Sequence, residues 1–188
     1  MKQRALFLDR DGIINVPPPP SVRYILHPDA FHLMPGIAET IRRCNQQHIP
    51  VVVITNQKCV AIGKLSPRNL SRIHARMEEL LRAENAYLDA VYACPHSEAD
   101  ACTCRKPLPG MLLTAAKALD LDLNASWMVG DQPRDIQAGK AAGCQTLHVH
   151  SEPVAFCDAS LPDTRSLPEW LLKHFLQKED CHSQIHTV

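Results

Sequence analysis

Residues Ala5–Gly12 read ALFLDRDG, a short apolar run that stops at two aspartates separated by one arginine. A run of this kind is typical of a buried strand, and Asp9 marks its end. Asp9 and Asp11 therefore stand at the carboxyl end of a predicted strand, which is where parallel sheets bind ligands. The fold then depends on whether further strands of the same kind follow.

Apolar runs do follow, and they alternate with helical patterns. Further strands are expected at Val51–Thr55, Leu88–Ala93, Trp127–Val129 and Thr146–Val149. The helical patterns begin at Ile37, after Pro35-Gly36, and at Pro67, after Ser66, and cover Pro109–Leu119, Asp135–Ala142 and Trp170–Leu176. Strands that are apolar throughout and separated by helices predict an α/β protein with a parallel sheet covered on both faces.

The proline-rich stretches Val16–Ser21 and Ser151–Pro168 are expected to be loops. We expect residues 1–188 to form a single domain, with a cysteine-rich loop at 94–104 and a C-terminal helical segment at about 168–180.

Charge and cysteine content narrow the classes of function. Lys plus Arg and Asp plus Glu number 20 each, so no global field favours nucleic acid or an anionic membrane. No apolar run is long enough to span a bilayer, and the amino terminus does not look like a signal peptide. We expect a cytoplasmic protein, and its eight cysteines then indicate free thiols or a metal site.

Polar residues follow several of the predicted strands. Asp9 and Asp11 end the first, Thr55 ends the second, and Asp131 follows the fourth, with Asp135 four residues on. A lone aspartate after a strand is more often a turn or a helix cap than a catalyst. Here the pattern recurs at successive strand ends, so we expect the carboxylates to converge at one edge of the sheet.

A site of this composition suits Mg²⁺, because crowded carboxylates repel one another unless a cation sits among them. Lys106, in the loop Arg105-Lys106-Pro107, would add a second positive charge. Such a site can hold a phosphoryl group and accept it on a carboxylate oxygen.

The same residues resemble the motifs of the haloacid dehalogenase superfamily of phosphotransferases. The motifs are Asp9-Arg10-Asp11-Gly12, Thr55-Asn56, Lys106-Pro107 and Gly130-Asp131-Gln132-Pro133-Arg134-Asp135, within a similarity that runs from about Ala5 to His150. The resemblance implies a Rossmann-like, doubly wound parallel sheet without a large cap domain. It also implies a Mg²⁺-dependent phosphomonoesterase.

The resemblance assigns roles to individual residues. Asp9 would be the nucleophile that becomes an aspartyl phosphate, and Asp11 the general acid and then the base. Thr55 and Lys106 would bind the transferring phosphoryl oxygens. Mg²⁺ would be held by the Asp9 side chain, the Asp11 backbone carbonyl and the Asp131 side chain, with Asp135 supporting. Residues expected to contact the substrate are Asn56, Gln57, Lys58, Arg105 and Gln132.

A second cluster, Cys94-Pro95-His96 and Cys102-Thr103-Cys104, brings three thiols and one imidazole close together in the chain. Such a set suits a closed, structural Zn²⁺ site, although its spacing is tighter than usual. The alternative is a group of free surface thiols. Of the other cysteines, Cys44 and Cys144 fit the core, whereas Cys59, Cys157 and Cys181 have no evident partner.

The cluster runs directly into Arg105 and Lys106, and this layout is similar to the histidinol-phosphate and heptose-bisphosphate phosphatase branch of the superfamily. The resemblance implies that the substrate is a small phosphorylated sugar and that Arg105 contacts it. The leading expectation is removal of the C7 phosphate of D-glycero-D-manno-heptose 1,7-bisphosphate, in lipopolysaccharide precursor synthesis, by a monomeric enzyme.

The sequence also departs from that branch at two elements that contact substrate. Ile62, within Lys58–Lys64, replaces an expected arginine, and prolines fill Pro17–Pro20. Three alternatives therefore remain. They are a histidinol-phosphate phosphatase, a zinc-stabilised module that binds phosphate without turnover, and a nucleic-acid 3′-phosphatase. The paired Asp9 and Asp11 argue against the second, and the neutral charge balance against the third.

Overall fold

The computed structural model describes residues 2–176, in which one parallel sheet forms the centre of the molecule. Its strands lie in the order β3-β2-β1-β4-β5-β6. Their bounds are β1 Leu6–Leu8, β2 Val51–Asn56, β3 Ala90–Cys94, β4 Trp127–Gly130, β5 Gln145–Val149 and β6 Ala159–Leu161. The parallel sheet predicted from the alternating pattern is confirmed.

The strand order reverses at β1, with β2 on one side and β4 on the other. Leu8 lies opposite Val53 of β2 and Val129 of β4, so the carboxyl ends of these strands lie close to one level. Ligands of doubly wound sheets bind at such a reversal point. The loops after β1, β2 and β4 therefore share one edge of the sheet.

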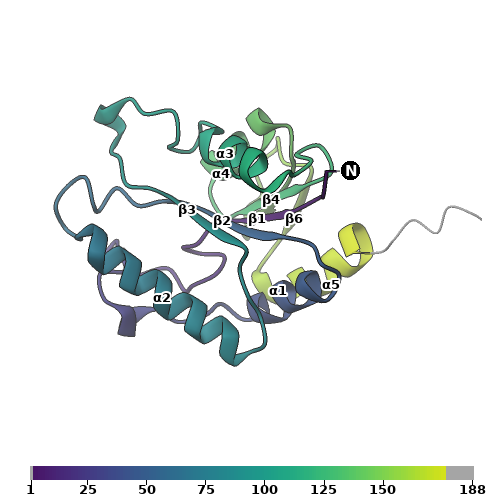
Figure 1. Cartoon of the computed structure of the whole chain (residues 1–188), viewed down its shortest axis with the longest axis horizontal. Coiled ribbons are helices and arrows are strands. Elements are labelled where there is room, and N and C mark those ends of the chain that lie inside the picture. The colour runs from purple at the N-terminus through teal and green to yellow at the C-terminus, as the bar shows by residue number, and fades with distance from the viewer. Residues whose placement is uncertain (1, 177–188) are drawn as a thin grey trace, which may run out of the picture.

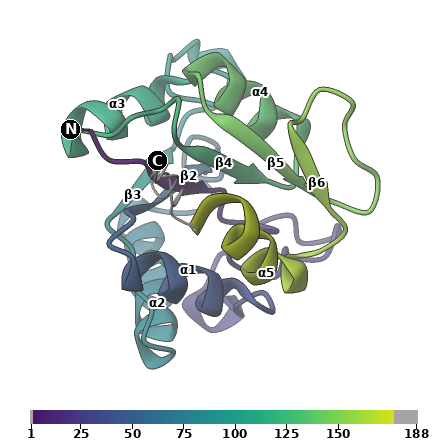
Figure 2. The ribbon, with the colours of Figure 1, turned by 90° about the vertical axis from the view of Figure 1, so that its right-hand side faces the viewer.

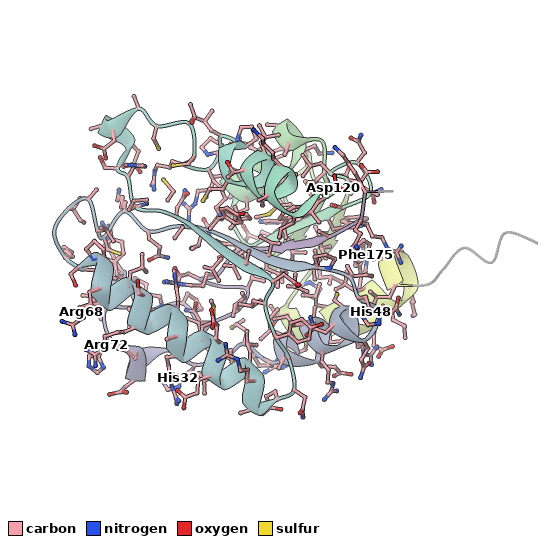
Figure 3. The ribbon with its side chains drawn as sticks, viewed as in Figure 1. His32, His48, Arg68, Arg72, Asp120 and Phe175 are labelled. Carbon is pink, nitrogen blue, oxygen red and sulfur yellow. The ribbon has the colours of Figure 1, made fainter. Side chains whose placement is uncertain are left out.

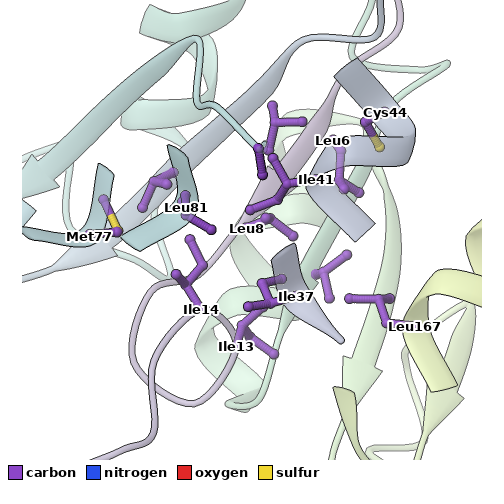
Figure 4. Packing of buried hydrophobic residues seen from close by; sticks show 14 of the residues in the cluster. Leu6, Leu8, Ile13, Ile14, Ile37, Ile41, Cys44, Met77, Leu81 and Leu167 are labelled. Atoms are coloured by element: carbon purple, nitrogen blue, oxygen red, sulfur yellow. The ribbon is translucent and has the colours of Figure 1, made fainter. Parts of the chain in front are cut away.

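Helices cover both faces of the sheet (Figures 1 and 2). On one face lie α1 (Ile37–Gln46), α2 (Pro67–Ala83) and α5 (Leu167–Leu171), and on the other α3 (Gly110–Leu119) and α4 (Pro133–Ala142). In the first layer, Ile37 and Ile41 of α1 pack close to Leu8 of β1 (Figure 4). In the second, Phe7 of the same strand packs in a cluster with Met111 and Met128. The sheet thus has an apolar core on each face.

Local signals set the helix ends. Ser66 caps α2 by accepting a hydrogen bond from the Asn69 backbone N–H at 3.1 Å, ahead of proline at the first helical position. Gly143 ends α4 with a φ of 90°, a left-handed conformation that glycine adopts without strain. Polar side chains such as His32, Arg68, Arg72 and Asp120 remain exposed outside these layers (Figure 3).

The prediction that Ser151–Pro168 is a loop throughout was wrong, because β6 lies within it. β6 has only three residues and contains no β-branched side chain, so nothing in its sequence indicates a strand. Pairing with β5 forms it. The predicted terminal helix begins at Leu167 and continues as a π-helical turn, Leu172–Leu176; its expected extension to 180 lies outside the described residues. No helix within 2–176 is long and apolar enough to cross a membrane.

Candidate active site

The carboxylates predicted to converge do so at the carboxyl edge of the sheet. Asp9 follows β1, Asp131 follows β4, and Asp135 lies in the first turn of α4. One carboxylate oxygen from each lies within 4.8 Å of the others. Asp9 and Asp135 are buried, so water screens their repulsion poorly.

Lys106 supplies the positive charge of this cluster. Its Nζ lies 2.7 Å from Asp9 Oδ1 and 2.7 Å from Asp135 Oδ1, and donates a hydrogen bond of 2.7 Å to the Ile54 carbonyl. Of the three N–H groups of this ammonium, two donate hydrogen bonds, to Asp9 Oδ1 and to the Ile54 carbonyl, and Asp135 forms an ion pair with it. Burial alone would lower the pKa of Lys106, but Asp135 and Asp9 raise it above its ordinary value. Lys106 is therefore a fixed, buried cation.

Asn56 fixes the loop that carries Lys106. Its side-chain amide donates to the Lys106 carbonyl at 3.0 Å, and its side-chain oxygen accepts from the Lys106 N–H at 3.0 Å. Both ends of the Asn56 amide are thus engaged on the backbone of a neighbouring loop. Thr55 is buried beside it, and its Oγ1 accepts from Gln57 Nε2 at 3.0 Å.

When Asp9, Asp131 and Asp135 are all ionised, they carry two more negative charges than Lys106 alone can balance. Burial raises the pKa of Asp9, and the positive charge of Lys106 opposes this rise. The neighbouring Asp135 and Asp131 carboxylates raise the pKa further. Asp131 Oδ1 is buried and has no hydrogen-bond partner among the described residues. An unpartnered oxygen beside a crowded carboxylate fits a hard divalent cation such as Mg²⁺.

Gly12 allows the loop after β1 to approach this cluster. It has a φ of 94°, and a Cβ placed on it would lie 2.5 Å from Asp131 Oδ2. Any side chain there would therefore be strained and would collide with a candidate metal ligand.

Asp11 is held by a set of donors. Arg10 Nη2 lies 2.9 Å from both of its carboxylate oxygens, Asn15 Nδ2 donates at 3.0 Å, and Gln57 Nε2 donates at 3.0 Å. Burial alone would raise the pKa of Asp11, but the Arg10 guanidinium and these hydrogen bonds lower it. At rest, Asp11 is therefore a carboxylate turned toward Arg10.

Sequence reasoning missed Arg10, Asn15 and His74 as parts of this site. Arg10 is completely buried, and its Nη1 lies 3.3 Å from His74 Nε2 of α2. Burial and the neighbouring Arg10 lower the pKa of His74 to about 4, so the imidazole is neutral and accepts the hydrogen bond. The position of Arg10 between two aspartates at a buried strand end could have indicated its role. His74 is far away in the chain, and no sequence pattern links it to the site.

The four predicted zinc ligands lie together at the end of β3. Cys94 Sγ is 3.7 Å from Cys102 Sγ and 3.2 Å from Cys104 Sγ, and His96 Nδ1 is 3.3 Å from Cys104 Sγ. A tetrahedral site with Zn–S bonds of about 2.3 Å has S···S edges of about 3.8 Å. The residues present therefore fit Zn²⁺.

The predicted substrate residues Lys58 and Arg105 both pair with Glu98. Gln132 instead donates to Asp131 Oδ2 at 3.0 Å. Two cavities meet at Arg134: one of about 220 Å³, which Asp11 lines together with Pro17 and Pro18, and one of about 510 Å³ beside Lys106 and Arg105. Substrate contact by Asn56, Gln57, Lys58, Arg105 and Gln132 stays a prediction.

Comparison with known proteins gives consistent results. The HAD-hydrolase-like family model matches residues 103–170. The chain is 39% identical over 141 residues to the D-glycero-beta-D-manno-heptose-1,7-bisphosphate 7-phosphatase of Bordetella bronchiseptica, covering 75% of this chain and 77% of that protein. Identity to the protein of the same name from Escherichia coli K12 is 34% over 177 residues, covering 89% and 87%.

A solved structure shares the fold. It is the D,D-heptose 1,7-bisphosphate phosphatase of B. bronchiseptica complexed with magnesium and phosphate. It matches with a TM-score of 0.83 and 33% identity, over 91% of this chain and 99% of that one.

Proposed function

We propose that this protein removes the C7 phosphate of D-glycero-beta-D-manno-heptose 1,7-bisphosphate. The premise is its family: the chain belongs to the HAD-like phosphatases that include the D-glycero-beta-D-manno-heptose-1,7-bisphosphate 7-phosphatases. It is a phosphoric monoester hydrolase of heptose metabolism. The observation that carries the proposal is the buried Asp9 carboxylate, held by Lys106 beside Asp131 and Asp135. This arrangement favours nucleophilic attack on a phosphoryl group.

In the first half of the reaction, an oxygen of Asp9 attacks phosphorus and forms a new P–O bond. The bond to the sugar oxygen breaks, and that oxygen takes a proton from Asp11. In the second half, Asp11 removes a proton from water, which attacks phosphorus and frees Asp9. Lys106 favours the ionised form of Asp9 and offsets the charge that develops on the phosphoryl oxygens.

Mg²⁺, when bound, would polarise the phosphoryl oxygens and offset the negative charge of the site. We propose the Asp9 and Asp131 side chains and the Asp11 backbone carbonyl as its ligands, with Asp135 supporting. The unpartnered Asp131 Oδ1 supports this assignment.

The two halves of the reaction make different demands on Asp11. Its contacts with Arg10, Asn15 and Gln57 stabilise the carboxylate, which is the form that activates water. To deliver a proton to the leaving sugar oxygen, Asp11 must first take up a proton from solvent, and its carboxyl group must turn away from Arg10 toward the substrate. Arg10 is therefore a positioning residue for Asp11.

We further propose that Cys94, His96, Cys102 and Cys104 hold a structural Zn²⁺ that stiffens the loop leading into Arg105 and Lys106. The purified protein is then expected to contain about one Zn²⁺ per chain. Cys102→Ser should lower zinc content and activity together, whereas Cys144→Ser, at a buried cysteine that is not one of the four ligands, should leave zinc content unchanged. Zinc-free, fully active protein prepared without a chelator would contradict the proposal.

Phosphate release tests the substrate. With Mg²⁺ present, kcat/KM for the heptose bisphosphate is expected to exceed that for histidinol phosphate by about a hundredfold or more, because polar contacts reject analogues that leave them unpaired. Preference for histidinol phosphate would contradict the proposal. We also propose that the enzyme acts as a monomer in the cytoplasm, in lipopolysaccharide precursor synthesis. We propose that it binds neither nucleic acid nor membranes, and its balanced charge supports this.

A further inference from the structure

Glu98 bridges the two cations that we assign to the substrate. Its Oε1 accepts from Arg105 Nη2 at 2.6 Å, and its Oε2 lies 3.2 Å from Lys58 Nζ. Glu98 lies in the short 3₁₀ turn Glu98–Asp100, in the loop after β3. One carboxylate thus connects the loop after β2, the zinc loop and the residue next to Lys106.

The bridge stands in the larger of the two cavities beside the active site. Glu98, Arg105, Lys106 and Arg134 are among the residues that line this space of about 510 Å³. The second terminal nitrogen of the Arg105 guanidinium also has a partner, since Nη1 donates to the His96 carbonyl at 3.2 Å. A second anion approaching Arg105 therefore meets a guanidinium that already has an acceptor.

The Glu98 side chain can leave its ion pairs for water more easily than the neighbouring side chains can. Its side chain is 66% exposed, against 15% for Arg105. The backbone of the turn is fixed separately, because the Ser97 N–H and hydroxyl both donate to Asp100 Oδ2, at 2.6 and 2.8 Å. The Glu98 side chain can thus rotate into water while the turn and Arg105 stay in place.

We propose that Glu98 is a resident counter-ion that the second phosphate of the substrate displaces, and that it thereby contributes to selection of sugar bisphosphates over monophosphates. This rests on the proposed function. A phosphate dianion binds a guanidinium through two charge-assisted hydrogen bonds and can replace a carboxylate that is largely solvated. A sugar hydroxyl is neutral and cannot, so a monophosphate gains little from Arg105 and Lys58.

Glu98→Gln tests this role, since it removes the charge and keeps the shape. KM for the heptose 1,7-bisphosphate is expected to fall by about two- to fivefold, the range that an exposed ion pair supplies. KM for p-nitrophenyl phosphate, which has no second phosphate, should not change. Glu84→Gln, an exposed glutamate at the end of α2, is the matched control, and unchanged zinc content shows that the loop remains intact.

An unchanged or higher KM for the bisphosphate in Glu98→Gln would overturn the role of Glu98; a higher value would mean that Glu98 orients Arg105 instead. In the Arg105→Ala background, the effect of Glu98→Gln should shrink, because its main partner is gone. Wild-type enzyme that fails to hydrolyse the bisphosphate would overturn the proposed function as well. Normal wild-type turnover with no effect of Glu98→Gln would overturn this inference alone.

Discussion

Asp9→Asn should eliminate hydrolysis of every phosphomonoester, because an amide cannot attack phosphorus as a carboxylate does. The expected loss in kcat is far above a hundredfold, since the attacking atom itself is removed. The amide is nearly isosteric with the carboxylate, so the fold should survive. Single-turnover phosphate release measures the effect without interference from slow product release.

Asp120→Asn is the matched control for Asp9→Asn. Asp120 is exposed at the end of α3 and has a left-handed backbone conformation that asparagine also adopts (Figure 3). Its activity should equal that of the wild type. Asp9→Asn protein that keeps more than about a hundredth of the wild-type rate would remove Asp9 as the nucleophile.

Lys106→Met should cause the second large loss. The substitution leaves Asp9 and Asp135 buried without their shared cation, and breaking a buried ion pair in this way costs about 3–5 kcal/mol of stability. The pKa of Asp9, already raised by burial, should rise further, so less of the nucleophile is ionised. We expect kcat to fall by about a thousandfold or more, the scale of losing a main electrostatic contact.

Urea unfolding and kcat together test this prediction. Lys106→Arg keeps the charge, but its planar fork cannot make the three short contacts of the ammonium, so partial recovery of stability is expected without full activity. Lys117→Met, on the exposed side of α3, controls for loss of a surface lysine. Near-normal turnover in Lys106→Met would contradict the role of this cation.

Much of the fold was predictable because it depends on local signals. Apolar runs such as Val51–Thr55 match observed strands, and Ser66-Pro67 caps a helix where predicted. β6 was not predictable, because its three residues form a strand only through pairing with β5.

The candidate site likewise has a part that the sequence predicts and a part that it does not. Asp9, Asp131 and Asp135 were predictable as neighbours, since parallel strands bring their carboxyl ends to one edge. Sequence alone did not reveal which side chains restrain the others. The contacts of Arg10 with His74, and of Glu98 with Lys58, join residues that are distant in the chain and are set by packing.

The most direct test of the account traps the phosphorylated enzyme. Asp11→Asn protein lacks the base that activates water, whereas p-nitrophenyl phosphate has a leaving group that departs without a general acid, so the intermediate should accumulate. After acid quenching and proteolysis, mass spectrometry should find one phosphoryl group on the peptide that contains residue 9, on Asp9 itself, and none in the matched double variant Asp9→Asn/Asp11→Asn. A stoichiometric burst of p-nitrophenol with phosphate on another residue, or on none, would contradict the proposal that Asp9 is the nucleophile.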